Sequence, residues 1–207
     1  MAATPALSTP AELELSSAPV VNPEVIPVYR PGQAVSLADF LAHPPDQCEW
    51  IDHIIEEKTG MTLNHAATQA KLAYLWQQYL FQEQLTGRVL VEALCRTQTQ
   101  GRRPDVAFVT GELLGQIAGK VALDQSFPLI AEIASPDDPG EGLLAKAKEY
   151  LESGAQEVWI IFPENKIVLT AIMASETVHW QVFDRTNPIV TRAILPGLVV
   201  NLAELFQ

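Results

Sequence analysis

Cysteines and long apolar runs are both scarce in this chain of 207 residues. The two cysteines, Cys48 and Cys95, do not make the disulfide framework that is typical of small secreted proteins. No apolar run approaches the roughly 18 residues that suggest a membrane span, and the first residues lack the basic and apolar stretches of a secretory signal. We therefore expect a cytoplasmic protein that does not enter the membrane, with both cysteines acting as small core residues.

Basic residues are also few, with 13 Lys and Arg against 25 Asp and Glu and a formal net charge of −12. Proteins that bind nucleic acids draw much of their affinity from Lys and Arg contacts with phosphates. This balance counts against tight, unaided binding to DNA. A local basic patch remains open, because four arginines cluster in the sequence: Arg88, Arg96, Arg102 and Arg103.

Several common functional motifs are missing as well. The sequence has no internal repeat, no glycine-rich phosphate loop and no Cys/His spacing of the kind that binds zinc. Nucleotide-binding and zinc-dependent classes that depend on these motifs are therefore not indicated.

The first part of the chain differs in composition from the rest. Residues 1–33 are rich in Ala, Pro, Ser and Val and show no clear period, so they cannot form a core alone. We expect 1–33 to be an N-terminal extension, either flexible or packed on a partner subunit, and 34–207 to be one domain. Val25–Val28 is apolar enough for such a partner contact.

Beyond this extension, strand and helix patterns alternate. The segments 127–136 and 157–162 are apolar strands joined by a helix around 143–151, and such a crossover predicts a parallel, right-handed pair. The predicted fold class is therefore α/β, more precisely an α+β mixed sheet with flanking helices and extra antiparallel strands. The other predicted elements are short helices at 36–43 and 201–206, strands at 48–57, 87–94, 105–109, 166–172 and 178–183, a helix from 64 to before 87, and helix with loop at 111–122. The helix from 64 has one apolar face, which we expect to cover one side of the sheet: Ala67, Ala70, Leu72, Leu75, Tyr79 and Leu80.

One carboxylate interrupts the most apolar of these strands. Phe127–Pro136 reads as a buried central strand, and Glu132 lies in its middle. An unpaired charge in such a strand costs several kcal/mol, so a metal ion, a lysine or both should compensate Glu132. Its alternative role is a buried ion pair with Arg or Lys.

Two further residues complete a pattern that is typical of phosphodiester hydrolysis. Asp105 starts the preceding apolar strand, and Lys146 lies on the helix that follows Glu132. Two carboxylates hold Mg²⁺ through oxygen, and a lysine stabilises the charge that develops on the phosphate. Taken alone, an Asp after a proline is more often an ordinary strand start.

These residues lie within a longer series of motifs that resembles the PD-(D/E)XK nuclease superfamily. More narrowly, the series is similar to a widespread bacterial family described as putative restriction endonucleases. The motifs that carry the resemblance are Glu49–Asp52, Asn64-His65, Arg103–Val109, Glu132–Pro136, Lys146 four residues before Tyr150, Gly154, Glu157–Pro163, Leu195–Leu198 and Leu202–Phe206.

The resemblance implies a restriction-endonuclease-like core and a Mg²⁺-dependent endonuclease that hydrolyses DNA, with Mn²⁺ as a possible substitute. Asp105, Glu132 and Lys146 are the implied catalytic residues. Asp105, Glu132 and the backbone carbonyl of Ile133 are the implied metal ligands. DNA is the implied partner, and we expect a homodimer or a higher homo-oligomer. The alternative is a catalytically weak or idle nuclease fold that serves as a binding or assembly module.

The chain departs from the family pattern at two places. The superfamily lysine normally follows the second acid by two residues, and here that position is Ala134, so the resemblance assigns the role to Lys146. The dipeptide Asp52-His53 stands where the family usually has Asp-Gly, which affects a turn. Helical periodicity predicts a buried face made by Leu143, Ala147, Tyr150 and Leu151. Lys146 and Lys148 lie on opposite flanks of that face, so periodicity does not choose between them.

Two more residues are possible supporting members of the site. Glu92 lies in the strand before Asp105 and is either a third acid or an exposed strand carboxylate. His65 lies at the start of a helix, where histidine is more often a capping or surface residue, but the resemblance includes it.

Overall fold

The computed structural model describes residues 26–58, 60–136 and 138–207 as a mixed α+β fold, which confirms the predicted fold class. A six-stranded sheet forms its centre, in the order β10-β9-β8-β7-β6-β3. Its strands are β3 (Gly87–Val91), β6 (Val106–Thr110), β7 (Leu129–Ile133), β8 (Glu157–Phe162), β9 (Ile167–Ala174) and β10 (Thr177–Phe183).

The only parallel neighbours among the named strands of this sheet are β7 and β8; the other pairs are antiparallel. Helix α4 (Gly140–Glu152) connects β7 with β8, as the strand–helix–strand pattern of the sequence predicts. Both strands are almost entirely buried, as expected for strands with helices on their faces. The central unit therefore follows directly from hydrophobic patterning.

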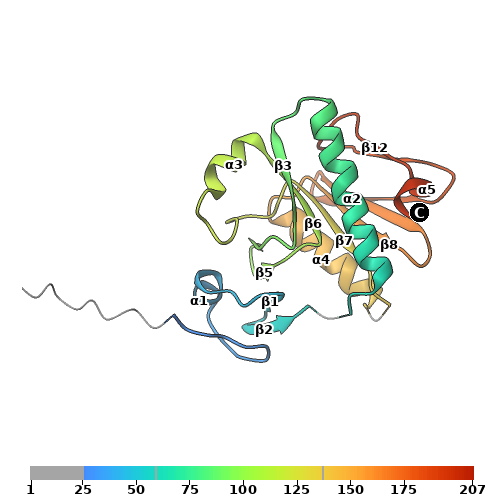
Figure 1. Cartoon of the computed structure of the whole chain (residues 1–207). Helices are drawn as coiled ribbons and strands as arrows, with labels where there is room; N and C mark the ends of the chain where they lie inside the picture. Colours follow the sequence, from blue (N-terminus) through green and yellow to red (C-terminus); the bar gives the residue numbers. More distant parts are fainter. Residues whose placement is uncertain (1–25, 59, 137) are drawn as a thin grey trace, which may run out of the picture.

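The two faces of the six-stranded sheet are covered by different helices (Figure 1). Helix α2 (Leu63–Gln82) packs on one face with Leu129, Ala131 and Ile133 of β7. Helix α4 packs on the other face, over Ile130. Because successive strand residues point to opposite faces, Glu132 shares the α4 face with Ile130. The pleat thus directs Glu132 toward Lys146.

A smaller four-stranded sheet, in the order β2-β1-β5-β4, lies at one end of the larger sheet (Figure 1). Gly32 and Gln33, at the end of the predicted extension, hydrogen-bond with Ile55 of this sheet. Residues 1–25 of the predicted extension lie outside the described residues, and the boundary between 1–33 and 34–207 stays a prediction. The elements at this end are α1 (Leu37–Ala42), β1 (Cys48–Ile51), β2 (Ile54–Glu57), β4 (Cys95–Arg96) and β5 (Gly101–Arg102).

The predicted strand 48–57 is a hairpin with a turn at Asp52-His53. Both turn residues have positive φ, 46° and 74°, as a two-residue hairpin loop requires. Glycine adopts such angles most easily, which explains why Asp-Gly is usual here. Gln100 exchanges two hydrogen bonds of 2.9 Å with Asp52 and stabilises the turn despite the histidine.

Helix α2 begins one residue before the predicted start and buries a face that differs in part from the predicted one. Leu72, Leu75 and Leu80 are buried as predicted, whereas Ala67 and Ala70 are exposed. Toward the start of the helix the buried face is formed by polar residues instead, His65 and Thr68.

The rest of the chain forms shorter elements. Both cysteines are free and buried, as expected, and burial raises the pKa of each thiol. Over the part of the chain that the structure describes, no helix is both long enough and apolar enough for a bilayer span. The remaining elements are α3 (Gly111–Ile117), β11 (Ile189–Val190), β12 (Val199–Val200) and α5 (Leu202–Leu205).

Candidate active site

A cavity of about 520 Å³ lies where the smaller sheet meets β6, β7 and α4. Its walls carry all three residues that the sequence singled out as catalytic, Asp105, Glu132 and Lys146, together with Ile133. These residues come from a loop, a central strand and a helix, so only the tertiary fold brings them together. Among the other cavity residues, which sequence reasoning had not assigned to the chemistry, are Glu49, Lys58 and Glu149.

Asp105 lies just before β6 and is only 2% exposed. Its Oδ2 accepts a 2.6 Å hydrogen bond from the backbone N–H of Ile133, which ties the start of β6 to the end of β7. Its Oδ1 lies 2.8 Å from Lys58 Nζ and 3.5 Å from His65 Nε2. Burial disfavours the charged carboxylate, but His65 and Lys58 outweigh burial and hold the pKa of Asp105 well below its usual range.

Glu132 is 3% exposed and points from β7 toward α4. Its Oε1 accepts a 2.7 Å hydrogen bond from the Tyr150 hydroxyl and lies 3.2 Å from Lys146 Nζ. Burial raises the pKa of Glu132 to about 7, although the Lys146 ammonium opposes that shift. The sequence predicted that a lysine, a metal ion or both compensate this carboxylate, and the structure contains the lysine.

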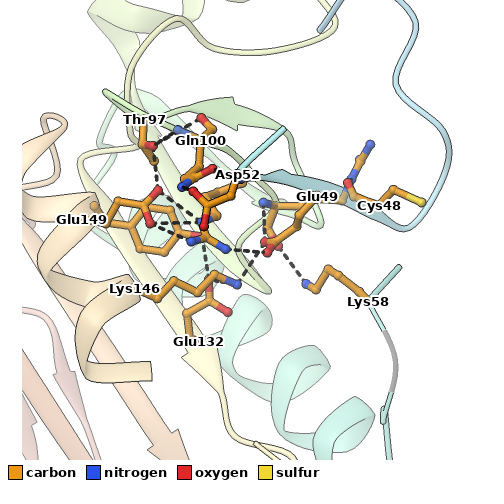
Figure 2. Close-up of polar contacts among 12 residues, drawn as sticks. Cys48, Glu49, Asp52, Lys58, Thr97, Gln100, Glu132, Lys146 and Glu149 are labelled. Carbon is orange, nitrogen blue, oxygen red and sulfur yellow. Dashed lines mark hydrogen bonds and ion pairs between the residues drawn. The ribbon is translucent and has the colours of Figure 1, made fainter. Parts of the chain in front are cut away.

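Lys146 is shared between two carboxylates. Its Nζ lies 3.0 Å from Oε1 of Glu49 as well as 3.2 Å from Glu132, and Figure 2 shows the Lys146 amine and the Glu49 carboxylate pointing toward each other. The Lys146 side chain is 15% exposed, whereas Lys148 is 61% exposed and pairs with Glu152 one turn away. The fold therefore places Lys146, and not Lys148, in the cavity.

Glu49 enters the site from β1 of the smaller sheet. Its Oε1 also accepts a 2.8 Å bond from the backbone N–H of Arg103, and its Oε2 lies 3.2 Å from Arg102. Arg102 in turn binds Glu149 through two nitrogens, with a shortest distance of 2.7 Å. The only sequence signal for Glu49 was its membership in the Glu49–Asp52 motif, because strand spacing does not say which distant charge it meets.

Glu92 is neither an ordinary exposed carboxylate nor a wall of the main cavity. It follows β3 with a positive φ of 51°, and its Oε2 lies 2.6 Å from Lys58 Nζ. Gln69 of α2 donates to its Oε1 at 2.9 Å. Glu92 therefore reaches the site indirectly, through a lysine that also binds Asp105.

His65 is buried, so the surface alternative for this residue is wrong. Thr62 caps α2 by accepting from the His65 N–H, and this fixes the first turn of the helix beside the site. Nδ1 of His65 lies 3.2 Å from Ser135 Oγ. Nε2 lies 3.5 Å from Asp105 Oδ1, and it makes no hydrogen bond to any residue that the structure describes. The His65 ring therefore belongs to the immediate surroundings of Asp105.

The four arginines considered as a DNA-binding patch do not act together. Arg102 is occupied by Glu49 and Glu149, and Arg103 donates to the backbone carbonyls of Cys48 and Glu92. Arg88 and Arg96 are exposed. Arg102 and Arg103 thus support the smaller sheet against the cavity and are not free to contact phosphates.

The donor set of the cavity suits a hard cation that keeps much of its own water. Across residues 26–58, 60–136 and 138–207, no three His, Cys, Asp or Glu side chains converge as metal ligands. Mg²⁺ commonly binds through one or two carboxylates, with water and substrate oxygens completing its shell. Asp105 and Glu132 supply two carboxylates, and each carboxylate has about four acceptor positions, so their present contacts leave room for a cation. These residues therefore fit Mg²⁺.

Comparison with known proteins supports the same family. The family model described as "Uma2: Putative restriction endonuclease" matches residues 36–203. Among solved structures, the chain is similar to a putative nuclease of the DUF820 family from Anabaena variabilis, with a TM-score of 0.72 and 20% sequence identity. That similarity covers 83% of this chain and 97% of the other, and at this identity it shows the fold. A search of curated proteins gave no match.

The family match spans every residue that lines the cavity, from Glu49 to Glu149. It agrees with the resemblance to PD-(D/E)XK nucleases that the sequence motifs carry. The chain belongs to the Uma2 family of putative restriction endonucleases.

Proposed function

We propose that this protein is a Mg²⁺-dependent endonuclease that hydrolyses phosphodiester bonds in DNA. The observation that carries the proposal is the convergence of Asp105, Glu132 and Lys146 in one cavity, with Lys146 Nζ 3.2 Å from Glu132. Family membership supports a nuclease. Hydrolysis of DNA and dependence on Mg²⁺ are the parts that we add.

In this proposal Asp105, Glu132 and the backbone carbonyl of Ile133 hold the cation, with Mn²⁺ as a substitute. When bound, a divalent cation polarises the phosphate and lowers the pKa of water. The protein groups have separate tasks. The Ile133 N–H orients Asp105, and the Tyr150 hydroxyl orients Glu132. Lys146 places a fixed positive charge beside Glu132, where it stabilises negative charge that develops on the phosphate during the reaction.

The second candidate is a binding or assembly module with an idle site. It is favoured by the net charge of −12 and by Arg102 and Arg103, which bind protein atoms. An acidic protein with few free basic groups has a weak electrostatic attraction to DNA. The homo-oligomeric state also stays a prediction.

A cleavage panel distinguishes the two candidates. Single-stranded, double-stranded and branched DNA are incubated with Mg²⁺ or Mn²⁺ and with wild type, Asp105→Asn or Asp124→Asn. Asp124 is the matched control, because its side chain is 75% exposed and pairs only with Lys120 among the described residues. We expect Asp105→Asn to lose activity by at least about 10² and Asp124→Asn to keep it. A wild type that binds metal but cuts no DNA form supports the binding module instead.

A further inference from the structure

Lys58 is a second, half-buried lysine beside the site, and no motif of the sequence assigned it a role. It directly follows β2, and its side chain is 18% exposed. An ammonium group has three donors, and all three are used within the protein. The acceptors are Glu92 Oε2 at 2.6 Å, the backbone carbonyl of Arg103 at 2.7 Å and Asp105 Oδ1 at 2.8 Å. The ammonium is therefore fixed in position.

These contacts make Lys58 the shared counter-ion of two acids. The Lys58 ammonium contacts both Asp105 and Glu92. Without this positive charge the two carboxylates would repel each other, and the repulsion would be strong because little water reaches them. Gln69 strengthens the arrangement, because its amide donates to Glu92 Oε1 and to the Asp105 carbonyl at 2.9 Å each. These contacts thus hold both acids in place within the protein itself.

Each of the two proposed metal-binding carboxylates, Asp105 and Glu132, is paired with a different lysine. Lys58 binds Asp105, and Lys146 binds Glu132. Figure 2 shows the two lysines reaching the site from different segments, Lys146 from a helix and Lys58 from a thin stretch of chain, which directly follows β2. Lys146 has Glu49 as a second partner, and Lys58 has Glu92 and the Arg103 carbonyl.

A divalent cation on Asp105 competes with this arrangement. Asp105 Oδ2 accepts from the backbone N–H of Ile133, which is fixed, whereas Oδ1 accepts from the Lys58 side chain, which can move. We therefore expect a cation on Asp105 to bind at Oδ1. A cation and an ammonium on the same oxygen repel each other strongly where water is scarce. Lys58 can give up Asp105 and keep its other two acceptors.

We propose that Lys58 sets the metal affinity of the site by acting as a built-in competitor for Asp105 Oδ1. Its ammonium holds Asp105 in place in the metal-free protein and withdraws toward Glu92 when a divalent cation binds. This inference rests on the proposed function, in which Asp105 and Glu132 hold the cation.

The test measures metal binding and needs no DNA substrate. Wild type, Lys58→Met, Lys58→Arg and the control Lys148→Met are titrated with Mg²⁺ and with Mn²⁺ in a calorimeter. Methionine keeps much of the length of lysine and removes its charge, whereas arginine keeps the charge. We expect Lys58→Met to bind either cation at least about tenfold more tightly than wild type. Lys58→Arg should not gain affinity, and Lys148→Met should match wild type.

Thermal melting with and without metal provides an independent readout. Lys58→Met leaves Asp105 and Glu92 without their counter-ion, so its melting temperature should fall in the absence of metal. Saturating Mg²⁺ should raise the melting temperature more in Lys58→Met than in wild type, because tighter binding to the folded state stabilises it more. If Lys58→Met does not fold without metal, Lys58→Gln is titrated in its place.

The outcomes separate this inference from the proposed function. Equal affinity in wild type and Lys58→Met, or weaker binding in Lys58→Met, overturns the competitor role and leaves the metal site intact. The absence of metal binding in all four proteins overturns both the inference and the proposed function.

Discussion

Replacement of Lys146 by alanine tests the site most directly. Lys146 Nζ lies between Glu49 and Glu132, at 3.0 and 3.2 Å, and both carboxylates are nearly fully buried. In the proposed reaction its charge matters most in the transition state, so turnover should fall by about 10²–10³. The affinity for DNA should change little, because one buried ammonium adds little to binding in the ground state.

The same substitution should also destabilise the fold. Removing one partner of a buried ion pair costs about 3–5 kcal/mol because the other charge remains buried. In Lys146→Ala, Arg102 still neutralises Glu49 and the Tyr150 hydroxyl still binds Glu132. We therefore expect a loss of stability near the lower end of that range. For a protein of this size, about 3 kcal/mol corresponds to a decrease in melting temperature of roughly 6–12 °C.

Lys148→Ala is the matched control on the same helix. Its side chain is mostly exposed and pairs with Glu152, so its loss should change stability by less than about 0.5 kcal/mol. Single-turnover cleavage is measured well below both melting temperatures, and melting is followed by circular dichroism. Equal losses of turnover in the two variants would show that Lys146 is not the catalytic lysine. An unchanged melting temperature in Lys146→Ala would refute the buried-pair argument.

Two further predictions concern buried carboxylates. Glu49→Gln should lower turnover about tenfold or more in the wild-type background and have no further effect in Lys146→Ala, because Glu49 acts by positioning Lys146; a second loss of the same size in a double-mutant cycle would contradict this. Glu157 is fully buried and accepts from the Trp159 indole and the backbone N–H groups of Arg192 and Ala193, so Glu157→Ala should lower the free energy of unfolding by about 3–5 kcal/mol in urea titrations. A loss below about 1 kcal/mol would show that water replaces the carboxylate.

The periodicity of apolar residues was sufficient to predict the central architecture. It predicted β7, α4 and β8 as a strand–helix–strand unit, and the predicted buried face of α4, which includes Leu143, Ala147 and Tyr150, is the observed one. These elements bury apolar side chains at regular intervals, and regular burial is a local property that is visible in the sequence. The order of the motifs also predicted the family, and the match of the family model to residues 36–203 confirms that prediction.

Periodicity failed where a buried face is polar. On α2 the predicted stripe followed Ala67 and Ala70, but the buried stripe runs through His65 and Thr68, next to the site. Alanine tolerates either environment, so it marks a face weakly. A histidine turned inward toward Asp105 has no signature in hydrophobic spacing.

The charge pairs of the cavity were decided only by the tertiary structure. Helical spacing left Lys146 and Lys148 equivalent, and the contacts with Glu49 and Glu132 distinguish them. Lys58 was not recognised as a site residue, because its partner Asp105 lies 47 positions further along the chain. An ion pair forms when two charged side chains lie close together in the folded protein, and residues that are far apart in the chain can meet this condition at any spacing. Such pairs therefore produce no periodic pattern in the sequence. Hydrophobic burial repeats along each element and can therefore be read locally, whereas the pairing of distant charges depends on how the two sheets and α4 come together.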